Sequence, residues 1–111
     1  MPKEVPEADG RIFRTLRERA LERFAEQILD ELATVCSDRS RGAHERYLQV
    51  CRLLRERDRA MADAFDYLSR SRMLLQLAAM RSLGLLDAGD LETMSQATQE
   101  RVRLLTEGPP G

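Results

Sequence analysis

Proline is missing from the body of this sequence. The four prolines lie near the two ends, at Pro2, Pro6, Pro109 and Pro110. Proline removes a backbone donor and clashes with the preceding helical turn, so long helices exclude it from their interiors. Tryptophan is absent, aromatic residues make up only 5%, and the β-branched residues typical of strands are few. We therefore predict an all-α protein.

Other absences narrow the functional class and the compartment. The sequence contains no run of 18 or more apolar residues, so we expect no membrane-spanning helix, and its first ten residues lack the apolar stretch of a signal peptide. The two cysteines, Cys36 and Cys51, are interpreted as reduced thiols, with a disulfide as the less favoured alternative. Only one of the 18 basic residues is lysine, which favours a GC-rich bacterial genome. We expect a cytoplasmic bacterial protein.

Catalytic and metal-binding patterns are also missing. His44 is the single histidine, whereas a zinc site needs three or four ligands at characteristic spacings. No phosphate-binding loop, nucleophile motif or Cys-x-x-Cys pair is present. Asp58 is a carboxylate without the second acid, histidine or nucleophile of a general acid–base site. We expect no catalytic residue, no cofactor, no metal and no independent enzymatic activity.

The charge pattern gives nucleic-acid binding limited support. The net charge of −1 creates no overall attraction to polyanions. Two basic stretches, Arg11–Arg23 and Arg39–Arg59, would form a basic end if the first turn brought them together. Acidic residues interrupt both stretches, and no exposed aromatics are interleaved for base stacking. We therefore do not expect nucleic-acid binding to be the main role.

Apolar periodicity predicts the helices. Residues 1–9 are expected to be a flexible tail, 10–107 a single helical domain and 108–111 a second tail. A first helix is predicted over residues 11–35, followed by a loop at "CSDRSRG". A long central helix is predicted over residues 43–83, with a break at Ser69–Ser71 as the alternative.

The end of the central helix and the start of the last one have local signals. Gly84 is a natural C-terminal stop. Asp87 is suited to cap the last helix, with Asp90 in the position of the capping-box acid. That helix is predicted to extend to Thr106. The fold class is thus a bundle of three to four helices.

The central segment carries a stripe spaced by three and four residues, mostly apolar, which predicts a helix–helix interface. We expect two central helices to pair antiparallel about a two-fold axis near Phe65. Asp58 and Arg72 would then fix the register, or alternatively lie at the rim of a four-helix bundle. The expected interface residues are Tyr47, Cys51, Leu54, Asp58, Met61, Phe65, Leu68, Arg72 and Leu75.

These observations favour a homodimeric protein–protein interaction or adaptor module with a further protein partner that the sequence does not identify. Two alternatives remain open. One is a nucleic-acid-associated regulator that uses the arginine-rich end, and the other is a non-catalytic helical subunit of a larger enzyme.

Overall fold

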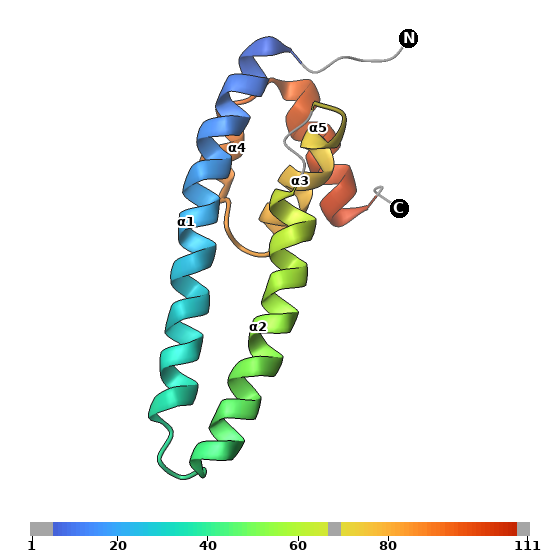
Figure 1. Ribbon diagram of the computed structural model, residues 1–111. Helices are drawn as coiled ribbons and strands as arrows, with labels where there is room; N and C mark the ends of the chain where they lie inside the picture. Colours follow the sequence, from blue (N-terminus) through green and yellow to red (C-terminus); the bar gives the residue numbers. More distant parts are fainter. Residues whose placement is uncertain (1–5, 67–69, 109–111) are drawn as a thin grey trace.

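The computed structural model describes residues 6–66 and 70–108, and every regular element in those ranges is a helix (Figure 1). The all-α prediction is therefore confirmed. The helices in chain order are α1 (Glu7–Ser37), α2 (Ala43–Phe65), α3 (Arg70–Ser82), α4 (Ala88–Glu92) and α5 (Gln96–Glu107).

The two longest helices, α1 and α2, form an antiparallel hairpin (Figure 1). The predicted loop joins them, and within it Asp38 accepts hydrogen bonds from the backbone N–H (3.1 Å) and the hydroxyl (2.5 Å) of Ser40. Midway along the hairpin, Arg57 of α2 donates two hydrogen bonds, of 3.0 and 2.7 Å, to the Glu31 carboxylate of α1. This bidentate ion pair fixes how the two helices align along their length.

The three shorter helices pack at one end of the hairpin, where α1 begins and α2 ends (Figure 1). We call this part the head. Its core brings together Leu16 and Phe24 of α1, Leu77 and Met80 of α3 and Val102 of α5, each at most 3% exposed. The chain measures 58 × 33 × 23 Å and has a radius of gyration of 17.0 Å, against about 13 Å for a compact chain of this length. The hairpin thus extends well beyond the head.

The prediction of one continuous helix over 43–83 is wrong. The α2 helix ends at Phe65, Asp66 is extended (ψ 148°), and α3 begins at Arg70. The alternative break at Ser69–Ser71 lay close by, although Ser69 is outside the described residues. A physical reason is burial, because a straight helix would hold the apolar face of α3 away from α1.

Polar side chains from elsewhere in the chain stabilise the end of α2. Arg17 of α1 donates to the Phe65 carbonyl at 2.5 Å, and the Gln76 side-chain amide of α3 donates to the Asp66 carbonyl. Helix C-termini leave carbonyls without partners inside the helix, and buried carbonyls need substitutes. Arg17 and Gln76 supply these substitute hydrogen-bond donors.

The turn after α3 follows the sequence prediction. Gly84 has φ of +75°, and the bonds from Gly84 N–H to the Arg81 carbonyl and from Leu85 N–H to the Met80 carbonyl form a Schellman motif. The capping box of Asp87 and Asp90 is present at the start of α4.

The last predicted helix is interrupted. The α4 helix ends at Glu92, and Ser95 caps a new helix, α5, by accepting from the Thr98 N–H. A serine before a helical segment is a second N-cap signal, which the expectation of one helix from Asp87 to Thr106 overlooked.

The N-terminal boundary also differs from the prediction of a tail over residues 1–9. The α1 helix begins at Glu7, and Asp9 is only 2% exposed. Its carboxylate accepts from Ser95 N–H (3.0 Å), Ser95 Oγ (2.6 Å) and Thr98 Oγ1 (2.6 Å). Burial by itself would raise the pKa of Asp9, but these hydrogen bonds outweigh it and hold the pKa below its ordinary value. Asp9 therefore connects the first turn of α1 to the cap of α5.

Asp9→Asn should lower the free energy of unfolding by about 1–3 kcal/mol at pH 7, because the amide cannot accept all three hydrogen bonds. Since the folded-state pKa lies below the unfolded value of about 3.9, the contribution of Asp9 is present above that pH and is lost as pH falls through the folded pKa. Urea unfolding of the native chain and the variant should show the difference shrinking below about pH 4. A difference that stayed constant with pH would contradict this role.

Candidate functional site

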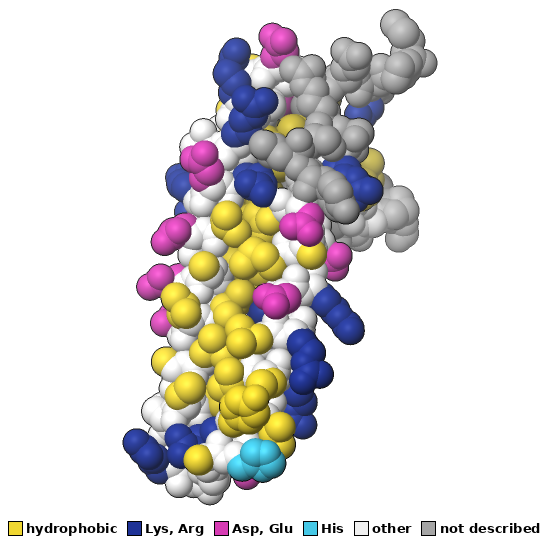
Figure 2. Space-filling model, in the orientation of Figure 1, with side chains coloured by type: hydrophobic (Ala, Val, Ile, Leu, Met, Phe, Trp, Pro, Cys, Tyr) yellow, Lys and Arg dark blue, Asp and Glu magenta, His cyan; other side chains and the backbone are white. Residues whose placement is uncertain are grey.

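The half of the hairpin that extends beyond the head exposes apolar side chains along one side. Leu29 is 61% exposed, Tyr47 63% and Leu54 39%, with the partly buried Leu32 and Cys51 between them. We call these five residues the open face. Figure 2 shows the corresponding strip of hydrophobic side chains between α1 and α2.

Helical spacing places these residues together. Tyr47, Cys51, Leu54 and Asp58 follow one another at intervals of four and three, which keeps them on one side of α2. Elsewhere on the hairpin, a groove is lined by five polar residues and two apolar ones: Glu31, Thr34, Val35, Gln49, Arg52, Leu53 and Glu56. The five residues of the open face, by contrast, include no charged side chain.

The structure divides the predicted interface into parts. Tyr47, Cys51 and Leu54 lie together along the half of α2 beyond the head, and Asp58 follows on the same side, nearer the head. Met61 is partly buried against the core. Leu68 lies outside the described residues, whereas Arg72 and Leu75 are exposed on α3. Asp58 and Arg72 therefore belong to separate helices, and the register predicted from one straight helix does not apply.

Phe65 is not available to a partner. Its ring is 3% exposed and stacks on Phe24, with centroids 6.2 Å apart. The Arg17 guanidinium lies 5.8 Å from the Phe65 ring centroid. A two-fold axis at Phe65 is therefore wrong, because the chain folds back and covers this residue with its own side chains.

The predicted basic end is also corrected. Because α1 and α2 run antiparallel, Arg11–Arg23 lies at the head, whereas Arg39 and the first turns of α2 lie at the far end of the hairpin (Figure 1). Arg19 and Arg23 bind Asp90. Both side chains are about half exposed, and their pairing with the Asp90 carboxylate offsets part of their charge.

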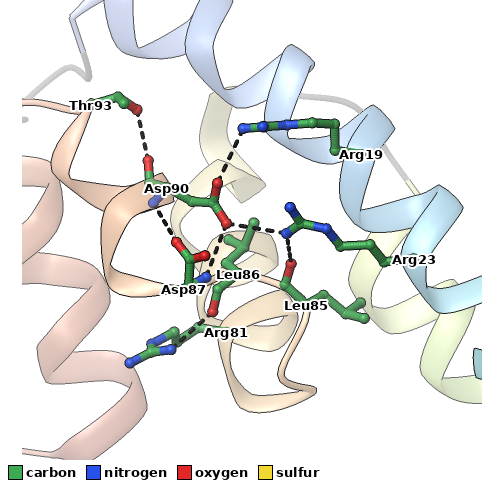
Figure 3. Close-up of polar contacts among 8 residues, drawn as sticks. All are labelled: Arg19, Arg23, Arg81, Leu85, Leu86, Asp87, Asp90 and Thr93. Atoms are coloured by element: carbon green, nitrogen blue, oxygen red, sulfur yellow. Dashed lines mark hydrogen bonds and ion pairs between the residues drawn. The ribbon is translucent and has the colours of Figure 1, made fainter.

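Asp90 lies at the centre of a cluster of polar contacts (Figure 3). The sequence analysis predicted only one part of this cluster, the capping box with Asp87. Asp90 accepts from Arg19 at 3.1 Å, from Arg23 at 3.2 Å and from the Asp87 N–H at 3.0 Å. Arg23 also donates to the Leu85 carbonyl at 2.7 Å. The spacing of Arg19 and Arg23, one turn apart on α1, was the signal in the sequence.

The role of this cluster is to hold the structure together. Burial by itself would raise the pKa of Asp90, but the Asp87 N–H and the two guanidinium groups outweigh it and lower the pKa below its ordinary value. A general acid or base needs a pKa near the working pH. The carboxylate instead stays ionised and joins α1 to α4.

No group of three or more His, Cys, Asp or Glu side chains is placed to hold a metal ion in residues 6–66 and 70–108. Within the same ranges, none of the helices combines the length and apolar character needed to cross a membrane. Comparison with protein-family models, curated proteins and solved structures found no match.

Proposed function

We propose that this protein is a helical protein–protein interaction module and that the open face is its working surface. The observation that carries the proposal is the contrast in burial along the same two helices. Phe24 and Phe65 are 3% exposed at the head, whereas Leu29 and Tyr47 are more than half exposed beyond it. Contiguous exposed apolar surface is typical of interaction sites.

The geometry suits a helical partner. Two antiparallel helices leave a shallow valley between them, and the apolar face of another helix packs into such a valley. Tyr47 adds a large amphipathic ring, a residue type enriched among the strongest contributors to binding. The proposal includes the case in which the protein is a non-catalytic subunit of a larger enzyme, because the same face would then contact that enzyme.

Photo-crosslinking tests whether the open face is occupied in the cell. A benzophenone amino acid replaces Tyr47 in one variant and Ala97, which is exposed on α5, in the control. We expect a crosslinked band of higher mass from position 47 and none from position 97. The proposal fails if position 47 gives no adduct, or if both positions give the same adducts.

A further inference from the structure

Acidic side chains border the apolar strip on both of its helices where the strip approaches the head. On α1, the exposed Glu18 and Glu22 lie eleven and seven residues before Leu29, intervals that keep them on its side of the helix. On α2, the exposed Asp58 comes four residues after Leu54. Figure 2 shows magenta groups on both sides of the apolar strip. An occupant of this surface therefore meets carboxylates along both edges.

These carboxylates are not neutralised within the chain. In residues 6–66 and 70–108, no ion pair involves Glu18, Glu22 or Asp58. Arg14, which is exposed one turn before Glu18, makes no ion pair with it. The three negative charges are therefore available to a cation from outside the chain.

The nearby arginines of α2 belong to a different side of that helix. Arg55 and Arg59 each come one residue after a member of the interface stripe, which turns them by about 100° around the helix. They line a hollow together with Arg52 and Glu56. Arg52 and Glu56 also line the groove found elsewhere on the hairpin, so this hollow adjoins that groove. The charge that directly borders the apolar strip is therefore mainly negative.

We propose that the open face binds a basic amphipathic helix of a partner protein. The apolar stripe of that helix lies on Leu29, Tyr47 and Leu54, and lysines or arginines on its two flanks meet the acidic edges. This inference rests on the proposed function, because it names the partner of the same surface. Complementary charges around an apolar contact favour the correct partner and orient it.

The heights of the acids along the hairpin show why both flanks of the partner must be basic. Glu31 and Arg57 lie at the same level, because they are paired. Counting from this pair, Asp58 lies about 12 Å, or roughly two turns, from Glu22 along the hairpin. The exposed Asp66, just after the end of α2, is about level with Glu22. A helix lying between the two edges thus meets acids on each side over at least two of its turns.

Two synthetic peptides test this assignment. Both are roughly 20 residues long, enough to form a helix, and both carry the same leucine stripe. Every flanking position is lysine in one peptide and glutamate in the other. Fluorescence anisotropy should show that the native chain binds the lysine peptide at least about tenfold more tightly at low salt. The difference should shrink in about 1 M salt, where the screening length falls to about 3 Å.

A variant without the acidic edges should lose this preference. Its three substitutions are Glu18→Gln, Glu22→Gln and Asp58→Asn. We expect its affinities for the two peptides to come within about threefold of each other, because the apolar strip is unchanged.

A matched control removes the same number of negative charges from exposed acids of the head. Its three substitutions are Glu92→Gln, Glu100→Gln and Glu107→Gln. It has the same net charge as the first variant and should keep the native preference for lysine. Circular dichroism confirms that both variants are helical.

Equal affinities of the native chain for the two peptides, tighter binding of the glutamate peptide, or no binding of either would each overturn the inference. So would a preference that survives removal of the acidic edges. In the cell, mass spectrometry of the adduct from position 47 should identify a basic segment with helical apolar spacing. An acidic segment, or a second copy of this chain, would overturn the inference and leave the proposed function standing. If position 47 crosslinks to nothing, both fail.

Discussion

Phe65→Ala should lower the free energy of unfolding by about 3–5 kcal/mol, the range for truncating a buried phenylalanine. The ring is 3% exposed and stacks on Phe24. Removing it leaves a cavity where α2 meets the head, and the Arg17 guanidinium loses the ring beneath it. The loss is large because Phe65 lies at the point where the chain turns back toward α3.

Tyr47→Ala is the matched control, because it truncates another aromatic residue of α2 that is 63% exposed. At low protein concentration it should change the free energy of unfolding by no more than about 0.5 kcal/mol. Urea denaturation followed by circular dichroism measures both variants. Equal losses for the two would mean that α2 does not end against a core as described.

Asp90→Ala is expected to cost about 2–3 kcal/mol of stability, because one carboxylate has two roles. It accepts from the Asp87 N–H in the capping box, and it is the shared acceptor of Arg19 and Arg23. Both arginines are about half exposed, so their contribution is smaller than that of a fully buried pair.

Asp87→Ala separates the two roles of Asp90. It removes the cap at the Asp90 N–H but leaves the contacts with Arg19 and Arg23, so it should cost only about 1 kcal/mol. Thermal unfolding of the two variants under identical conditions gives the comparison. A loss for Asp87→Ala as large as for Asp90→Ala would mean that the arginines add nothing to the joint between α1 and α4.

Local chemistry in the sequence was enough to predict much of the fold. The absence of internal proline predicted helices, the flexible backbone of Gly84 predicted the end of α3, and the Asp87 and Asp90 pair predicted the start of α4. The end of α2 at Phe65 could not be predicted in this way, because no glycine or proline marks it and the serines at Ser69–Ser71 indicated only an alternative break. Its carbonyl partners are Arg17, 48 residues away in sequence, and Gln76, and both are placed by tertiary packing.

In the candidate site too, some features follow from the local sequence and others only from tertiary packing. Regular spacing correctly placed Tyr47, Cys51, Leu54 and Asp58 on one side of one helix, since that depends only on helical geometry. Whether each residue lies open or buried depends on where the chain reverses, and the reversal covers Phe65.

The length of the hairpin beyond the head has a consequence for dynamics. There, α1 and α2 lie against each other and away from α3, α4 and α5 (Figure 1), and Leu29, Tyr47 and Leu54 are exposed. Segments with few buried contacts open at a lower free energy than the global unfolding of the protein. Backbone amides beyond the head should therefore exchange their hydrogens for deuterium faster than those of α3. Occupation of the open face would slow that exchange, so binding at one end of the molecule would also determine how much of the chain is persistently ordered.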